Sequence, residues 1–178
     1  MQAYVLLLRG INVGGSGKLP MADLRNMLST LGAADVATYI QSGNAVFRSG
    51  NDPETLAKAV ADAIETGFGF RPSTLVLPGA DLQKARDAFP FKAALDAPKT
   101  GHIWFLSAKP SPDLEALQAL KTPDEEFALT GTTFNLYAPS GIGRSKLAAK
   151  VEKLLGVAAT ARNLNSVAKL CDMIAALD

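Results

Sequence analysis

The fold of this chain is constrained most by the order in which short apolar runs alternate with capped helical segments. Tyr4–Leu8 is continuously apolar, as expected of a strand buried in a sheet. Helix-start signals follow at Pro20 and at Asp52–Glu54, each ahead of apolar residues at helical spacing. Between them, strands Val36–Ile40 and Ala45–Phe47 are predicted on either side of a hairpin turn at Gln41–Asn44. A further β-rich run follows at Ser73–Leu77. The resulting order, β-α-β-β-α-β, is that of a ferredoxin-like unit.

The same order recurs in the second half of the chain, after a predicted helix around Leu82–Ala88. The expected elements are a strand His102–Leu106, a helix from Ser111 through Leu120, a hairpin of Glu126–Leu129 and Thr133–Tyr137, a helix Ser145–Leu155, a strand Val157–Ala161 and an amphipathic helix Asn163–Leu177. We therefore predict an α+β protein of two packed ferredoxin-like halves, residues 1–78 and 79–178, with an additional C-terminal helix.

Composition excludes several classes of protein. The net charge of +1 provides no overall field that would recruit nucleic acid or a membrane. Cys171 is the only cysteine, so an intrachain disulfide or a cysteine-rich zinc site is impossible. No apolar run has the length of a membrane span or the form of a signal peptide. The sequence predicts a cytoplasmic protein with no metal and no cofactor.

The N-terminal loop, within the stretch LLLRGINVGGSGK, predicts an anion-binding element. Four glycines expose backbone amides to a ligand, and two basic residues, Arg9 and Lys18, bracket them. The loop is not a nucleotide-binding P-loop, because Asn12 replaces the required first glycine and Leu19 the required hydroxyl residue. The alternative is a glycine-rich connection built for tight packing.

A second glycine-containing basic stretch, Ser140–Lys146, repeats this pattern between a predicted strand and a predicted helix. Helix-start amides at Ser145 and Lys146 would meet the positive end of the helix dipole there, and Arg144 adds a bidentate donor. The alternative is an ordinary turn in which Ser145 only caps the helix and Arg144 is solvated.

Arg162 and Asn163 precede the last predicted helix. Asn163 suits a helix cap, and Arg162 could join the cations of the two glycine loops around one pocket. Our hypothesis is a small anionic, phosphorylated ligand held by backbone amides, neutralised by Arg and Lys and oriented by asparagine. The candidate binding residues are Arg9, Asn12, Gly14, Gly15, Lys18, Arg144, Lys146, Arg162 and Asn163.

No catalytic constellation is recognisable, although a transferase or hydrolase acting on such a ligand stays an alternative. Ser42 has no evident base, so a hairpin turn explains it better than a nucleophile does. His102 is interpreted as a surface or packing histidine and Cys171 as a core residue. Nucleic acid is the competing partner, but the strand Ala45–Arg48 has one aromatic and no RNA-binding motif. A purely structural or interaction protein is the third possibility.

Five segments carry a resemblance to a known family: LLRGINVGG, MADLR, YIQSGN, GRSKL and TARN, in this order along nearly the whole chain. On these residues the chain resembles a bacterial family that is defined by a domain of unknown function. The resemblance implies a compact, two-lobed α+β protein of paired ferredoxin-like units. It implies no established activity and no site residues.

Overall fold

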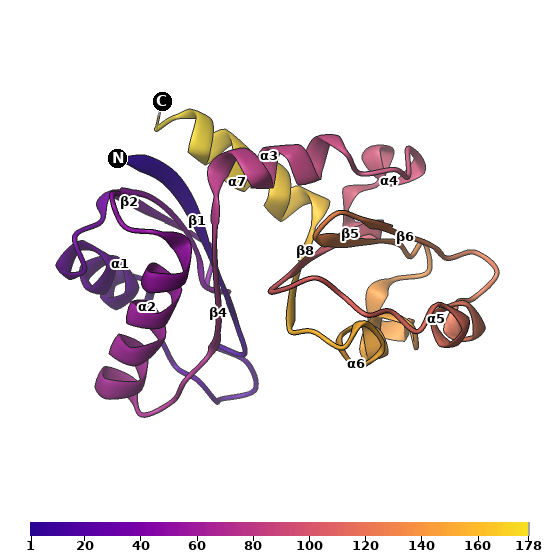
Figure 1. The fold of residues 1–178 in the computed structure, drawn as a ribbon, viewed down its shortest axis with the longest axis horizontal. Coiled ribbons are helices and arrows are strands. Elements are labelled where there is room, and N and C mark those ends of the chain that lie inside the picture. The colour runs from indigo at the N-terminus through magenta and orange to yellow at the C-terminus, as the bar shows by residue number, and fades with distance from the viewer. Residues whose placement is uncertain (178) are drawn as a thin grey trace. The chain divides into compact units, whose positions relative to one another are not determined.

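The computed structural model describes residues 1–177, and its first half has the predicted element order. The elements are β1 (Gln2–Arg9), α1 (Met21–Thr30), β2 (Ala34–Tyr39), β3 (Asn44–Ser49), α2 (Pro53–Phe68), β4 (Ser73–Pro78) and α3 (Gly79–Asp87). The strands form an antiparallel sheet in the order β2-β3-β1-β4, which is the ferredoxin-like arrangement. Helices α1 and α2 lie together on one face of this sheet (Figure 1).

Strand alternation decides what each face of the first sheet presents. Leu6 and Leu8 of β1 are fully or almost fully buried in the core under α1 and α2. Val5, Leu7 and Arg9 alternate with them and therefore point to the opposite face. The end of β1 thus carries a buried leucine toward the core and an arginine toward the other side of the sheet.

The helix signals at Asp52–Glu54 act as predicted. The side chain of Asp52 accepts a hydrogen bond from the Thr55 N–H at 2.9 Å, and Pro53 occupies the first turn of α2. Hydrogen bonding to the side chain and to the backbone of Thr55 lowers the pKa of the Asp52 carboxyl. Gly69, in the left-handed conformation with φ +75°, ends the helix. The connection from Gly69 to β4 therefore leaves the helix in a fixed direction.

The second half repeats this topology. Its elements are α4 (Ala93–Asp96), a 3-10 turn Pro98–Thr100, β5 (Gly101–Leu106), α5 (Leu114–Leu120), β6 (Glu126–Thr130), β7 (Thr133–Tyr137), 3-10 turns Ile142–Arg144 and Ala148–Lys150, α6 (Val151–Leu155), β8 (Ala159–Asn163) and α7 (Leu164–Ala175). Its strands are antiparallel in the order β6-β7-β5-β8, so β5 to β8 correspond one by one to β1 to β4. Phe134, fully buried, packs edge-on against Trp104 and stacks on Phe127 in its core.

The largest departure from the predicted elements of the second half concerns one helix. The helix expected over Ser145–Leu155 is confined to α6, Val151–Leu155, and a 3-10 turn precedes it. The hydroxyl of Ser145 accepts from the Ala148 N–H at 3.0 Å, so it closes a turn instead of starting an α-helix. The following strand also begins later than predicted, at Ala159, because Gly156 ends α6 in the left-handed conformation.

The chain divides into two compact units whose boundaries do not fall in loops. The first unit comprises Met1–Gln83 and the stretch from Lys169 onward, and the second comprises Lys84–Ala168. The boundary therefore crosses α3 and α7, the helices that follow the last strand of each half.

Candidate functional site

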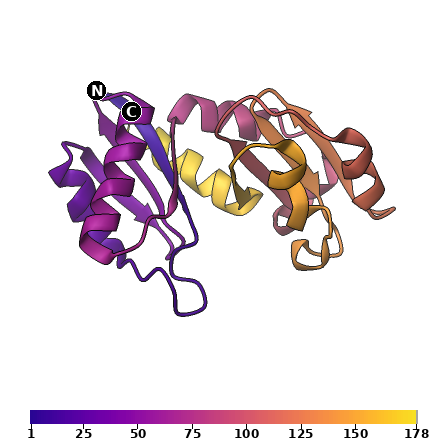
Figure 2. The ribbon, with the colours of Figure 1, turned by 60° about the horizontal axis from the view of Figure 1, so that its bottom comes forward.

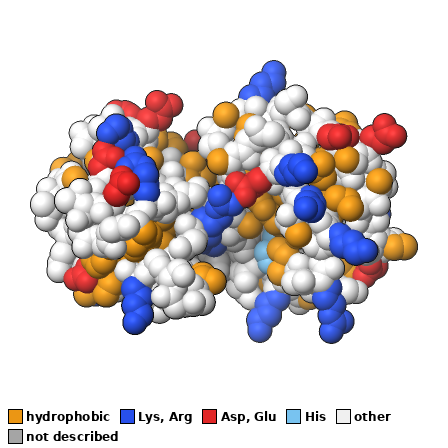
Figure 3. Space-filling view, turned by 90° about the horizontal axis from the view of Figure 1, so that it is seen from below, with side chains coloured by type: hydrophobic (Ala, Val, Ile, Leu, Met, Phe, Trp, Pro, Cys, Tyr) orange, Lys and Arg blue, Asp and Glu red, His pale blue; other side chains and the backbone are white. Residues whose placement is uncertain are grey.

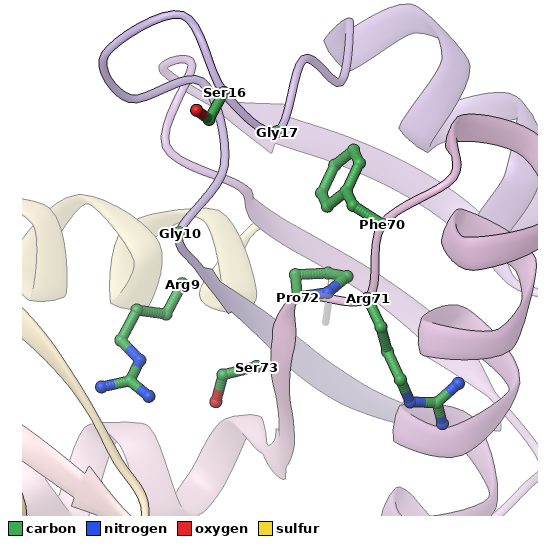
Figure 4. Close-up of a pocket in the computed structure, with 8 residues that line it drawn as sticks. All are labelled: Arg9, Gly10, Ser16, Gly17, Phe70, Arg71, Pro72 and Ser73. Atoms are coloured by element: carbon green, nitrogen blue, oxygen red, sulfur yellow. The ribbon is translucent and has the colours of Figure 1, made fainter.

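A pocket of about 600 Å³ lies in the first unit where β1 ends and β4 begins (Figure 4). Because β1 and β4 are antiparallel neighbours, the end of one meets the start of the other, and Arg9 pairs directly with Ser73. The loop after β1 and the connection before β4 complete the pocket. Its lining residues are Arg9, Gly10, Ser16, Gly17, Phe70, Arg71, Pro72 and Ser73.

The side chains of the pocket differ in direction. Directly paired residues of antiparallel strands share a face, and Figure 4 shows Arg9 and Ser73 extending to the same side. Arg71 points away from them (Figure 4) and donates to Asp62 at 2.6 Å and to Glu65 at 2.8 Å. These carboxylates raise the pKa of Arg71, and their negative charges balance the positive charge of its guanidinium. Of the two arginines, Arg9 is therefore the one whose side chain lies on the same side as Ser73.

The glycine loop after β1 forms a small hairpin. Val13 and Ser16 form an isolated bridge around Gly14 and Gly15, whose φ angles of +58° and +80° suit a two-residue turn. The Ser16 N–H donates to Val13 O at 3.0 Å, and the Asn12 N–H donates to Gly17 O at 2.9 Å. The hairpin extends beyond the strand ends (Figure 2). Two of the amides expected to hold an anion are thus used inside the loop, and Gly14 and Gly15 are exposed at its tip.

Asn12 has a structural role in this loop. Its Nδ2 donates to Leu19 O at 3.0 Å and to Gln41 O at 2.8 Å, and its Oδ1 accepts from the Leu19 N–H at 2.9 Å. Its φ of +51° is one that asparagine tolerates better than most residues. The side chain predicted to orient a ligand therefore fixes the base of the hairpin and joins it to the β2–β3 turn.

We expect Asn12→Ala to destabilise the protein by about 1–3 kcal/mol, because the Leu19 amide and two carbonyls lose their partner. Urea unfolding at pH 7 measures this loss. Asn26→Ala, at an exposed position on α1, is the matched control and should change stability by less than about 0.5 kcal/mol. Equal stabilities of the two variants would contradict the structural role of Asn12.

The predicted residues of the second glycine loop lie in the second unit. Arg144 and Lys146 are exposed. The N–H groups of Arg144 and Ser145 donate to Gly141 O and Ile142 O, at 3.2 and 3.1 Å. No α-helix begins at Ser145, so the expected helix dipole is absent from this loop. An anion there would depend on the two cationic side chains instead of on helix-start amides.

Arg162 and Asn163 end β8 in the same unit. Arg162 pairs with Ile103, donates to Ala161 O at 2.8 Å and is half-buried. Burial lowers its pKa to about 10, which leaves the guanidinium charged at neutral pH. Asn163 caps α7, since its Oδ1 accepts from the Ser166 N–H at 2.9 Å. That these residues meet the N-terminal loop around one ligand stays a prediction.

Comparison with known proteins identifies the family. A family model described as "Protein of unknown function (DUF1697)" matches residues 1–134. The chain belongs to this family. A search of curated proteins finds no match. Among solved structures, the chain is similar to the conserved bacterial protein SP0830 from Streptococcus pneumoniae, with 24% identity, a TM-score of 0.72 and coverage of 97% of this chain and 98% of that one. The family and the α+β fold are confirmed, and no function follows from them.

Of the eight residues that line the pocket, only Arg9 is among the candidate binding residues predicted from the sequence. Phe70, Arg71, Pro72 and Ser73 belong to no recognisable motif. The signal was present in the predicted topology, because a β-α-β-β-α-β order places the start of the fourth strand beside the end of the first. Residues flanking Ser73 could therefore have been assigned to the same site as Arg9.

Three other residues with potentially reactive side chains have the structural roles that the sequence predicts. Ser42 lies in the β2–β3 turn, where its hydroxyl accepts from Asn44 Nδ2 at 2.9 Å. Cys171 is buried in α7. His102 is 7% exposed and lies beside Trp104, with ring centroids 6.1 Å apart. Over residues 1–177, no three His, Cys, Asp or Glu side chains gather as metal ligands, and no helix there has the length and apolarity to cross a bilayer.

Proposed function

We propose that this protein binds a small anionic ligand of the phosphate class, with the anion in the pocket between the end of β1 and the start of β4. The pairing of Arg9 with Ser73 carries the proposal, since it places a guanidinium and a hydroxyl on one side of the sheet at the pocket. The guanidinium of arginine is the side-chain group best suited to bidentate recognition of phosphate or carboxylate. The hydroxyl of Ser16, which also lines the pocket, is a further donor.

The distribution of charge favours a small ligand over nucleic acid. On the face of each unit drawn in Figure 3, Lys and Arg side chains lie in several separate places with acidic, apolar and uncharged groups among them. Nucleic-acid binding draws most of its affinity from many basic contacts along a phosphate backbone. A single pocket containing one suitably directed arginine fits a single anionic group better. The proposal retains the cytoplasmic location predicted from the sequence.

The test is a calorimetric and thermal-shift titration with inorganic phosphate and glycerol 1-phosphate against chloride at equal ionic strength. We expect Arg9→Ala to weaken phosphate binding by roughly tenfold to a hundredfold, the effect of losing a charged hydrogen-bonding partner. Arg25→Ala is the matched control, because Arg25 is an exposed arginine of the same unit that donates to Thr38 and does not line the pocket.

Arg9→Lys, which keeps the charge and loses the planar fork, should bind phosphate with intermediate affinity. Equal affinities of the parent protein, Arg9→Ala and Arg25→Ala would contradict the proposal. Binding only to oligonucleotides, with a steep salt dependence, would replace it by the nucleic-acid alternative.

The fuller form of the proposal adds the cations of the second unit to the same ligand. Arg144→Ala, Lys146→Ala and Arg162→Ala extend the titration, and Lys18→Ala tests the remaining cation of the first loop. A loss of phosphate affinity in any of the three second-unit variants would support a ligand shared by both glycine loops. Unchanged affinity in all three would confine the binding site to the pocket beside Arg9.

A further inference from the structure

Strand β6 lies at the end of the second sheet, with β7 on one side and no strand on the other. Glu126 and Thr130, its first and last residues, are exposed, and the apolar residues between them are partly exposed. Among the described residues, no backbone hydrogen bond joins residues 126–130 to any element other than β7. One edge of β6 therefore offers unpaired backbone groups to another strand.

The backbone groups at this outer edge are those of Phe127 and Leu129. A two-residue turn closes the β6–β7 hairpin at Thr130 and Thr133, which is a hydrogen-bonded position of an antiparallel pair. Because such positions alternate along a strand, Ala128 also directs its backbone groups toward β7. The N–H and C=O groups of Phe127 and Leu129 point the opposite way, out of the sheet edge.

The other three edge strands have features that discourage pairing, and β6 has none of them. In β2 the register shifts between Ala34 and Ala37, as at a β-bulge. Strand β4 ends at Pro78, which has no N–H to donate. In β8 the Ala159 N–H is already bonded to Glu152 Oε1 at 3.0 Å. Strand β6 keeps an uninterrupted register with β7 and contains no proline, lysine or arginine.

We propose that β6 pairs with β6 of a second copy of this chain, antiparallel about a two-fold axis at Ala128. This register pairs all five residues of the strand. Phe127 then faces Leu129 of the second copy, and the outward backbone groups of both residues form hydrogen bonds across the axis. Glu126 faces the uncharged Thr130, so no two like charges lie directly opposite each other.

The geometry of the pairing also specifies the kind of dimer. The two Glu126 carboxylates lie about 13 Å apart along the strands, which is beyond the screening length in physiological salt. The contact is the same on both copies and uses the outer edge of both β6 strands, so it closes at two chains instead of forming a fibre. Two five-residue strands bury less surface than a standard interface, and we therefore expect a weak dimer that dissociates on dilution.

Sedimentation of the full chain between about 1 μM and about 1 mM tests for this dimer. The mass should rise from that of a monomer toward twice that value. Thr130→Lys places a cation opposite Glu126, whereas Thr130→Glu places an anion there, and both variants lose the same bond from Asn135 Nδ2. The dimer dissociation constant of Thr130→Glu should be at least about fivefold higher than that of Thr130→Lys, since each dimer contains the contact twice.

Thr30→Lys and Thr30→Glu form the matched control pair. Thr30 is an exposed threonine at the end of α1, so these variants change the net charge equally and leave β6 untouched. Their dissociation constants should agree with each other. The thermal unfolding midpoints of all four variants verify that each is folded.

Disulfide trapping measures the register directly. Cys171, the only cysteine of the chain, is buried, so a thiol introduced on β6 is the reactive one. On oxidation, a mixture of Glu126→Cys and Thr130→Cys should form a disulfide-linked dimer, because the two positions face each other at a distance that a disulfide can bridge. Each variant alone should stay monomeric in non-reducing denaturing electrophoresis, since its two thiols lie about 13 Å apart along the strands.

Three results would overturn the proposal. A mass that stays at the monomer value up to about 1 mM would do so and would leave the edge of β6 to a strand of another protein. Equal dissociation constants of Thr130→Lys and Thr130→Glu would contradict the pairing of Thr130 with Glu126. Disulfide formation in either cysteine variant alone, at the rate seen in the mixture, would contradict the two-fold axis at Ala128.

Discussion

Gly43→Ala is expected to destabilise the protein by about 2–5 kcal/mol and to lower the unfolding midpoint by roughly 5–20 °C. Gly43 lies in the β2–β3 turn with φ +76°, a conformation that costs an L-residue about 1–2 kcal/mol. A Cβ there would lie 2.6 Å from Leu8 Cβ and 2.7 Å from Ile11 Cδ1, both in the buried core. Overpacking of this kind adds about 1–3 kcal/mol.

Gly14→Ala is the control that separates the two causes. Gly14 has a φ of +58°, but a Cβ there would have nothing within 4 Å. This variant should show the backbone cost alone, about 1–2 kcal/mol. Urea unfolding of both variants gives the difference in their free energies of unfolding. Equal slopes of the unfolding free energy against urea concentration verify that both variants unfold to a similar state. If Gly43→Ala is no less stable than Gly14→Ala, the result contradicts the close packing of the β2–β3 turn against Leu8 and Ile11.

The second large effect is a loss of stability in acid that depends on one side chain. His102 is the only histidine of the chain, and burial lowers its pKa from 6.5 to about 4. Its Nδ1 has no hydrogen-bond partner in the part of the chain that the structure describes. Between these two pKa values the unfolded chain binds a proton that the folded protein does not. The stability that the neutral His102 contributes is therefore fully present above pH 6.5 and is lost as the pH falls toward 4. The free energy of unfolding decreases on this account by about 2 kcal/mol at pH 5 and about 3 kcal/mol at pH 4.

His102→Phe isolates this contribution, because it removes the titrating group and keeps a ring beside Trp104. Between pH 7.5 and pH 5, the free energy of unfolding should decrease by about 2 kcal/mol more in the parent protein than in the variant. The NMR signals of the single imidazole offer a direct reading, and they should stay in the neutral form down to about pH 5. Titration near pH 6.5, or parallel pH dependence in both proteins, would refute the buried neutral state.

The fold was predictable because its signals are local. The cap at Asp52 and the apolar run in β1 specify their elements without reference to distant residues. Errors occurred where a side chain or a turn overrides the local pattern. Ile40 was expected to end a strand, yet β2 ends at Tyr39 and Ile40 has a φ of +50°, which is rare for a β-branched residue. In the same way, the hydroxyl of Ser145 diverted the predicted helix into a turn.

The candidate site was less predictable because it depends on long-range pairing. Arg9 was recognisable from its place after a buried strand, but its neighbour Ser73 follows only from the order of strands in the sheet. The role of Asn12 depends on Gln41, which approaches it only when the β2–β3 turn is in place. Phe70 resembles any core residue in sequence, and its position on a pocket wall emerges from the folded connection.

The division of α7 between the two units has a consequence for synthesis on the ribosome. The first unit includes the chain from Lys169 onward, where Ile174, 3% exposed, fills the space beside Gly79. Gly79 is translated before all of the second unit, and Ile174 after it. At a translation rate of about 5–20 residues per second, roughly 5–20 s pass between the synthesis of Gly79 and that of Ile174. During that interval the surface that Ile174 later covers beside Gly79 stays open on the nascent chain, and a chaperone has access to it.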